Sequence, residues 1–320
     1  MQELTHRVVE TNGIRMHIAE CGVGPLVIMC HGFPESWYSW RHQLSALAEA
    51  GFHAVAPDMR GYGGTDRPTA VDQYTLLHLV GDVVGLLDAL GADQAVVAGH
   101  DWGARVAWHC ALLRPDRFRG VIGLSLPFVP RLPTRPTATM PRREDALYYL
   151  LYFQSPAAET EFARDVRMTI RSIFYTGSAD SGDVPRDVTM VPTGGGFLSL
   201  MTNPASLPAW ITEADVDHYV KDFACTGFRG GLNWYRNLDR NWELLAPFAD
   251  ARVTVPALFI AGDRDLAVAP FRGLDPVIAN LTRYVPQLRA IRRLPACGHC
   301  TQQERAPQVN SAMLEFLRTM

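Results

Sequence analysis

The sequence has little lysine, no excess of basic charge and no long apolar run. Lys221 is the only lysine among 30 basic residues, which indicates codon bias in a GC-rich genome such as that of an actinobacterium. The formal net charge of -3 gives no basic surface of the kind that nucleic acid or an anionic membrane attracts. The longest apolar runs, at 25–30 and 121–126, are too short to span a bilayer, and the first 20 residues resemble no signal peptide. We therefore expect a cytoplasmic protein that binds neither nucleic acid nor membrane.

The cysteines do not indicate a disulfide-bonded fold. Six are scattered along the chain without the paired spacing of a disulfide framework. Cys297 and Cys300 form a C-x-x-C pair around Gly298 and His299, but no second pair of ligands lies nearby to complete a zinc site. We expect free thiols and no bound metal.

What the chain does have is an alternation of short apolar runs with segments of helical periodicity. A hairpin is expected at 8–20, with Asn12-Gly13 as its turn. Buried strands are expected at 25–30, 52–57, 94–98, 121–126, 256–261 and 290–294. Helices are expected at 40–50, 74–90 and 105–113. Strands alternating with helices predict an α/β protein with a mostly parallel sheet flanked by helices.

The alternation stops near residue 130. Four prolines fall within 130–141, and the pattern from Glu144 to Trp242 is helical without a buried strand run. Two apolar strand patterns then follow. The sequence therefore predicts a core formed by residues 1–131 and 246–320, with a helical insert at 132–245.

The most informative motif is Gly99-His100-Asp101-Trp102-Gly103, between an expected strand and an expected helix. In a G-x-S-x-G elbow, small flanking residues allow a sharp turn that holds the central nucleophile in a strained conformation. Here the central residue is Asp101 instead of serine. Taken alone, Asp101 could equally be an N-cap of the following helix.

Three further motifs, each at the end of an expected strand, favour the nucleophile. The first is HGFP at 31–34, where the backbone N–H of Phe33, with that of Trp102, would form an oxyanion hole. The second is GDRD at 262–265, and the third is the Gly298-His299 pair. The order nucleophile, acid, histidine is that of a hydrolase, and the carboxyl ends of parallel strands are where such sheets place their sites.

With these motifs in place, the sequence resembles the epoxide hydrolases of the α/β-hydrolase superfamily over essentially its whole length. The resemblance implies an α/β-hydrolase fold whose helical insert is a cap over the active site. The matching stretches are HGFPESWYSWRHQ (31–43), RGYGGTDRP (60–68), GHDWGARVAW (99–108), LYFQSP (151–156), TGFRGGLNWYRNLDRNWE (226–243) and GHCTQQE (298–304).

The resemblance also implies that two tyrosines of the insert hydrogen-bond the epoxide oxygen. By motif these are Tyr235 and Tyr149, although Tyr148 and Tyr152 flank the latter and compete for the role. Leu150 follows Tyr149 where many relatives carry glutamine.

An aspartate suits this reaction because an epoxide carbon is sp3. Attack by Asp101 makes an alkyl ester whose carbonyl water can later attack, whereas a serine would make an inert ether. His299 would activate that water and Asp265 would orient the imidazole. The expected partners are a small-molecule epoxide and water, and the chemistry needs no metal or organic cofactor.

Several assignments stay open at this point. Asp263 competes with Asp265 for the acid role. His100 is expected to pack beneath the elbow, and Glu35 either holds water or forms a surface salt bridge. Trp37, Trp102 and Leu150 are expected to line an apolar substrate pocket, whereas Trp40 is expected in the core.

Two other functions compete with epoxide opening. A haloalkane or haloacid dehalogenase uses the same Asp-His-Asp residues, but Phe33 stands where many of them have asparagine. A non-catalytic small-molecule binder of this fold would not need the intact set. The apolar pocket predicts a hydrophobic or aryl epoxide, for detoxification or for bacterial natural-product biosynthesis. A homodimer is also left open by the sequence.

Overall fold

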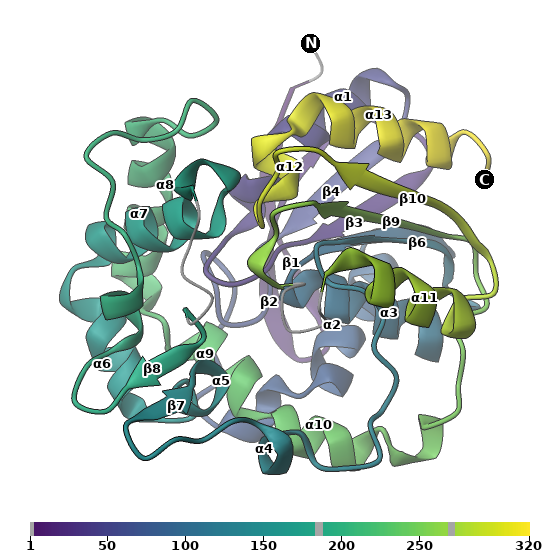
Figure 1. Ribbon diagram of the computed structural model, residues 1–320. Helices are drawn as coiled ribbons and strands as arrows, with labels where there is room; N and C mark the ends of the chain where they lie inside the picture. Colours follow the sequence, from purple (N-terminus) through teal and green to yellow (C-terminus); the bar gives the residue numbers. More distant parts are fainter. Residues whose placement is uncertain (1–2, 183–187, 268–272) are drawn as a thin grey trace.

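The computed structural model describes residues 3–182, 188–267 and 273–320, and these residues contain one large sheet (Figure 1). Its strand order is β1-β2-β4-β3-β5-β6-β9-β10. β1 pairs antiparallel with β2, β2 pairs antiparallel with β4, and all other neighbours are parallel. The strands are β1 (Thr5–Thr11), β2 (Ile14–Cys21), β3 (Leu26–Cys30), β4 (His53–Pro57), β5 (Ala95–His100), β6 (Phe118–Leu124), β9 (Ala257–Gly262) and β10 (Leu288–Leu294).

The hairpin turn lies where the sequence predicts it. Asn12 and Gly13 both have positive φ, 45° and 75°, which is the backbone that an Asn-Gly hairpin turn requires. The expectation of a buried strand at 290–294 is wrong. β10 is an edge strand whose side chains are mostly partly or fully exposed, and Arg292 and Arg293 on it pair with Glu315 and Asp275.

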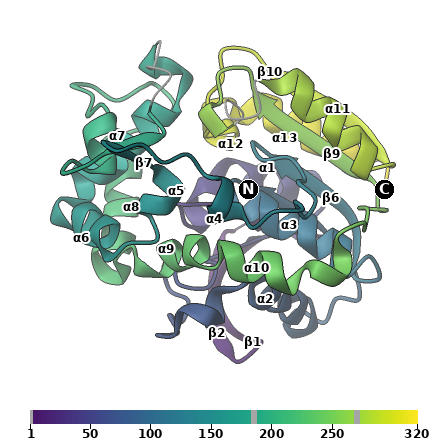
Figure 2. The same cartoon turned by 60° about the horizontal axis from the view of Figure 1, so that its bottom comes forward.

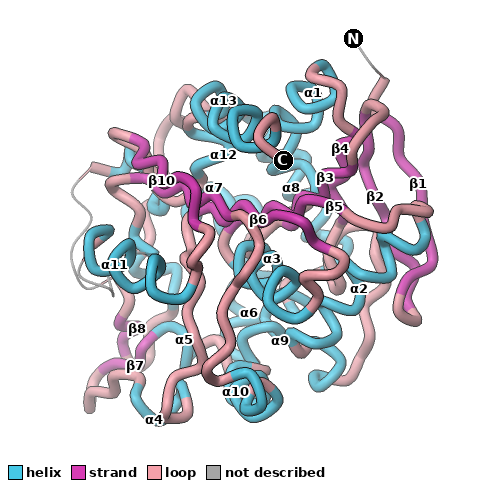
Figure 3. Tube along the Cα trace, turned by 90° about the vertical axis from the view of Figure 1, so that its right-hand side faces the viewer, coloured by secondary structure: helices cyan, strands magenta, loops and turns pink. Residues whose placement is uncertain are grey.

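Helices cover both faces of the sheet (Figures 1 and 3). One face carries α1 (Arg41–Glu49), α12 (Thr301–Glu304) and α13 (Ala306–Leu317), and the other carries α2 (Leu76–Ala89), α3 (Trp102–Leu113) and α11 (Leu274–Tyr284). Alternate residues of β3 divide between the two layers. Val27 packs in the cluster that holds α1, α13 and the fully buried Trp40, whereas Ile28 packs in the cluster of α2 and α3. The mostly parallel sheet flanked by helices is thus confirmed, and Trp40 is a core residue.

Between β6 and β9 the chain leaves the sheet and forms a block of helices beside it (Figures 1 and 2). These are α4 (Pro136–Thr139), α5 (Tyr149–Tyr152), α6 (Pro156–Arg164), α7 (Val166–Gly177), α8 (Glu213–Thr226), α9 (Arg229–Arg236) and α10 (Leu238–Leu244). The block also contains a small antiparallel pair, β7 (Ala146–Tyr148) and β8 (Met190–Pro192), too short for sequence periodicity to indicate. Asn241 of α10 accepts a hydrogen bond from the backbone N–H of Leu76 at 2.7 Å, which ties the block to the start of α2.

Short 3-10 turns complete the described segments: η1 (Trp37–Trp40), η2 (Val71–Tyr74), η3 (Ala179–Ser181), η4 (Phe197–Leu200) and η5 (Ala246–Phe248). Across the described residues, none of the helices has the length and apolar character needed to cross a bilayer.

Candidate active site

Asp101 stands at a sharp turn between β5 and α3. Its backbone has φ 52° and ψ -120°, and residues other than glycine rarely adopt a positive φ. The turn closes only because its neighbours lack side chains: a Cβ on Gly99 would overlap the Gly103 carbonyl, and one on Gly103 would overlap that of Cys30. The Asp101 side chain makes no capping hydrogen bond to α3, so the alternative of a simple helix cap is not what the structure shows.

The loop after β3 presses against this carboxylate. The backbone N–H of Phe33 donates to Asp101 Oδ1 at 3.0 Å. Gly32 permits that approach, because a Cβ there would lie 2.6 Å from the same oxygen. Trp102 is the first residue of α3, where backbone N–H groups have no partner within the helix. The Phe33 N–H thus contacts the carboxylate, and the Trp102 N–H remains the second donor predicted for an oxyanion hole.

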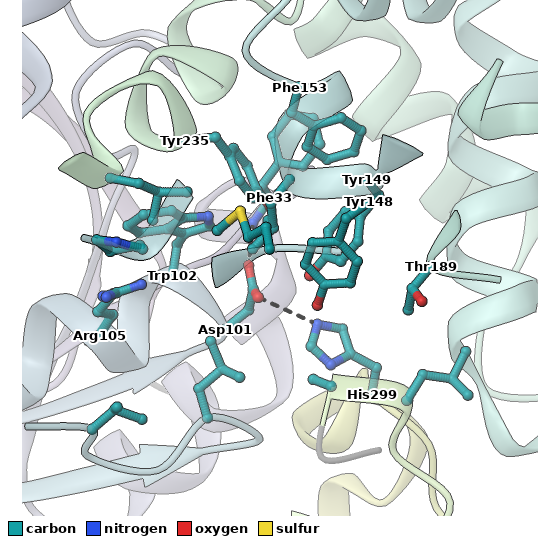
Figure 4. A pocket seen from close by; sticks show the side chains of 18 of the residues that line it. Phe33, Asp101, Trp102, Arg105, Tyr148, Tyr149, Phe153, Thr189, Tyr235 and His299 are labelled. Atoms are coloured by element: carbon teal, nitrogen blue, oxygen red, sulfur yellow. Dashed lines mark hydrogen bonds and ion pairs between the residues drawn. The ribbon is translucent and has the colours of Figure 1, made fainter. Parts of the chain in front are cut away.

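His299 faces the other carboxylate oxygen (Figure 4). Its Nε2 lies 3.6 Å from Asp101 Oδ2, and its Nδ1 lies 2.9 Å from Asp265 Oδ1. Burial alone would lower the pKa of this imidazole, but Asp265 and Asp101 outweigh it and raise the pKa well above its ordinary value. The histidine is thus held between two carboxylates, with one nitrogen toward each.

Of the two candidate acids, only Asp265 contacts the histidine. Asp263 instead accepts a hydrogen bond from the backbone N–H of Cys297 at 3.3 Å. Asp265 is buried, which raises its pKa, yet the charge of His299 and hydrogen bonds from His299 and Ser125 bring that pKa below the ordinary value. Asp265 therefore remains a carboxylate beside the imidazole.

Ser125 joins this group, and the sequence analysis did not single it out. It follows β6 with φ 68°, and its hydroxyl donates to Asp265 Oδ2 and lies 2.8 Å from His299 Nδ1. A lone serine in Leu-Ser-Leu-Pro carries no motif. Its position at the carboxyl end of a central parallel strand is the one signal that could have indicated it.

Two tyrosines of the helical block reach the same pocket, Tyr149 at the start of α5 and Tyr235 on α9 (Figure 4). Burial and the nearby charge of Asp101 raise both phenol pKa values well above 10, so both phenols carry their protons. Tyr148 also lines the pocket and hydrogen-bonds Tyr149. Tyr152 donates to Glu161 at 2.8 Å and is not one of the lining residues.

The pocket has a volume of about 430 Å³ and its wall is mainly apolar and aromatic. The lining includes these predicted residues: Phe33, Asp101, Trp102, Tyr149, Leu150, Tyr235 and His299. Trp37 is not among them, so the expectation that it contacts substrate is wrong. It lies on η1, where its ring packs edge-on against His6 and His218.

Glu35 and His100 form a buried pair beneath the elbow. Glu35 accepts hydrogen bonds from the Gly32 N–H and from His100 Nδ1, both at 2.9 Å, and is only 2% exposed, so the surface salt bridge is excluded. His100 Nε2 donates to the His299 backbone carbonyl at 2.7 Å. Burial opposes the charge of Glu35, but His100 and the Gly32 N–H lower its pKa to about 2. The pair connects the oxyanion loop to the histidine loop.

The C-x-x-C pair contributes nothing to this chemistry. Cys297 and Cys300 are buried free thiols, and burial raises the pKa of both, so neither is a ready thiolate.

Comparison with known proteins defines the class first. The sequence profile of the alpha/beta hydrolase fold family matches residues 25–176. Relatives that match over their full length then identify the family within this class. Epoxide hydrolase A of Mycobacterium tuberculosis is 46% identical, with 98% of this chain and 97% of the relative covered. Epoxide hydrolase 3 of Siraitia grosvenorii is 42% identical, with 99% of each covered.

Solved structures with a similar fold are also epoxide hydrolases. An epoxide hydrolase from an endophytic Streptomyces superposes with a TM-score of 0.94 at 44% identity, covering 98% of this chain and 95% of that one. Epoxide Hydrolase A from Mycobacterium thermoresistibile gives a TM-score of 0.91 at 45% identity, covering 99% and 98%. The chain belongs to the epoxide hydrolases of the α/β-hydrolase fold, a class of cofactor-independent hydrolases, as its motifs predicted.

Proposed function

We propose that this enzyme opens a hydrophobic or aryl epoxide to a vicinal diol through an alkyl ester on Asp101. The observation that carries the proposal is the presence of a carboxylate at the elbow, with His299 beside it and two protonated phenols lining the same pocket. A serine at position 101 would suit acyl substrates, whereas a carboxylate suits an sp3 carbon.

The two carboxylate oxygens have different surroundings, which assigns them different tasks. Oδ1 already accepts the Phe33 N–H, so Oδ2 is the oxygen that attacks the epoxide carbon. As the epoxide C–O bond breaks, Tyr149 or Tyr235 gives its proton to the departing alkoxide and becomes a phenolate. Oδ1 is then the ester carbonyl oxygen, already beside the Phe33 N–H.

The second step regenerates the enzyme. Formation of the ester removes the Asp101 charge that helps to raise the His299 pKa, so the imidazole can now act as a base. His299 takes a proton from water, which attacks the ester carbonyl carbon, and the Phe33 and Trp102 N–H groups stabilise the oxyanion. Asp265 and Ser125 hold the imidazole meanwhile. Collapse breaks the bond from the acyl carbon to the alcohol oxygen, His299 protonates the diol, and the proton left on Asp101 returns to the phenolate.

We assign the helical insert, residues 132–245, the role of a cap, with residues 1–131 and 246–320 as the catalytic core. The assignment is supported by the origin of the phenols, because Tyr149 and Tyr235 both come from the insert while Asp101 and His299 come from the core. The apolar wall suits a hydrophobic substrate, in detoxification or in natural-product biosynthesis.

A single-turnover reaction with styrene oxide in oxygen-18 water tests this mechanism. The oxygen that enters the first diol should come from Asp101, and the label should appear in the Asp101 peptide by mass spectrometry. Label in the first diol, with an unlabelled Asp101, would mean direct attack by water. Asp101→Asn is the control: it should fold and form no diol, once deamidation to aspartate is excluded by mass.

A further inference from the structure

Arg105 places a cation in the wall of this apolar pocket. It lies on the first turn of α3, the helix that Asp101 precedes, and both residues line the pocket. It is one of the residues that line the pocket, and Figure 4 shows it beside Trp102. Its Cζ lies 5.2 Å from the centre of the Trp102 ring.

The Arg105 guanidinium makes no close ion pair within the described part of the chain, although the charge of Asp101 acts on it at longer range. No carboxylate oxygen there lies within 4.0 Å of it, and its N–H groups make no hydrogen bond. Arg60, which is buried, binds Asp82 through two nitrogens. The stacking on Trp102 orients Arg105 but leaves its five N–H donors unused.

Arg105 is partly exposed, and its nitrogens are not among the buried polar atoms that lack a partner, so its donors can reach water or a ligand in the pocket. Arg131, the other arginine of the lining, is already engaged: its Nε donates to the Trp242 carbonyl at 2.8 Å and it stacks 3.9 Å over that ring. Asp101 is the only carboxylate among the described residues that line the pocket. The pocket therefore has an excess of positive charge and one guanidinium available to a ligand.

We propose that Arg105 makes this enzyme selective for epoxides that carry a carboxylate, which its guanidinium binds as an ion pair. A guanidinium and a carboxylate match in shape and can form two parallel hydrogen bonds. The inference rests on the proposed function and names its substrate class. Arg105 and Asp101 line the same pocket and lie on either side of the start of α3, so the carboxylate belongs within a few carbons of the epoxide ring. The remaining apolar wall holds the hydrocarbon or aryl part.

Matched substrates test the proposal. The substrates are phenyl-substituted epoxides that differ in the position of one carboxylate. It is attached directly to the epoxide ring, or through one or two methylenes, or at the para position of the phenyl group. Each acid is compared with the carboxamide of equal shape. For at least one pair, the acid should have a kcat/KM about 10- to 100-fold above the amide, as the loss of a charged hydrogen bond implies. If no acid is preferred to its amide, the proposal is wrong.

Arginine variants assign the preference to one residue. Arg105→Met should lower the ratio of acid to amide kcat/KM to near one, and Arg105→Lys should retain part of it. Arg114→Met is the matched control, because Arg114 follows the far end of the same helix, is partly exposed and pairs with Asp116 at 2.6 Å. It should leave the ratio unchanged. A preference that survives Arg105→Met in a folded protein overturns the proposal.

Different results would overturn the role of Arg105 and the proposed function. If Arg105 acts only on the Asp101 charge, its variants will slow acid and amide equally and leave the ratio fixed, which overturns the inference while diol formation continues. If neither the acids, the amides nor styrene oxide give diol with the wild-type enzyme, the proposed function itself is wrong and the inference falls with it.

Discussion

Tyr149 and Tyr235 are two phenols that share one pocket with a single carboxylate, and their chemistry separates epoxide opening from its nearest rival. An alkoxide is strongly basic and leaves readily only when it receives a proton or a strong hydrogen bond. A halide is weakly basic and needs neither. Both phenols are held protonated by burial and by Asp101, as a proton donor at neutral pH must be.

Tyr149→Phe and Tyr235→Phe should therefore each slow epoxide opening by roughly 10- to 100-fold, and the double variant should slow it more. Because the donors act in the transition state, kcat and kcat/KM should fall together, measured by diol formation at steady state. Tyr152→Phe is the matched control, since the Tyr152 hydroxyl donates to Glu161 at 2.8 Å and Tyr152 does not line the pocket. Near wild-type diol formation by the double variant would show that the two tyrosines are packing residues and not the proton donors. Halide release from haloalkanes, without diol formation from any epoxide, would favour a dehalogenase.

At the scale of elements, the strand-elbow-helix unit formed by β5, Asp101 and α3 determines where the nucleophile stands. The strained backbone of Asp101 is held because β3, β5 and α3 approach one another through glycines. The site thus depends on backbone contacts that admit no extra methyl group.

Gly103→Ala should destabilise the protein by about 1–3 kcal/mol, because its Cβ would meet the Cys30 carbonyl and force backbone shifts. Urea unfolding followed by circular dichroism measures the loss, and diol formation should fall with it. Gly177→Ala is the control for stability only: it lies at the end of α7, where the nearest atom to a new Cβ is His299 Cβ at 3.6 Å, an ordinary contact. Equal stabilities for the two variants would argue against a tight elbow.

At the scale of the whole molecule, the buried pair of Glu35 and His100 connects three loops of the site. The pKa of Glu35 is lowered from 4.5 to about 2, so its contribution to stability is complete above pH 4.5. That contribution is lost as the pH falls from about 4.5 to about 2. The His100 pKa is raised by Glu35 against the effect of burial, so its share is lost only as the pH rises.

Stability measured by urea unfolding between pH 7 and pH 2.5 should therefore fall less steeply below pH 4.5 in Glu35→Gln than in wild type. The variant should also be less stable at pH 7, because the imidazolium loses its buried counterion. Glu49→Gln removes an exposed glutamate at the end of α1 and should follow the wild-type curve. Parallel acid limbs for wild type and Glu35→Gln would show that the pair does not set acid stability.

Much of the architecture was predictable because it depends on local patterns. Apolar runs predicted the central strands, Asn12-Gly13 predicted the hairpin turn, and the motifs at strand ends indicated Asp101 and His299. The errors arose where local pattern and tertiary position differ. An apolar run near Leu294 looked like a buried strand, yet the strand lies at the edge of the sheet, and Trp37 was expected in a pocket from which the fold separates it.

The sequence by itself determined the class of nucleophile and the order of the catalytic segments, since both are properties of short motifs. Only the tertiary structure decided which side chains meet them. Ser125 reaches His299 across 174 positions and Glu35 reaches His100 across 65, and neither contact leaves a local signature. Arg105 shows its free guanidinium only once the fold has placed every described carboxylate, except the nucleophile, outside its pocket. The physical reason is that partners, burial and charge balance belong to the packed molecule, whereas turns and periodicity belong to the chain.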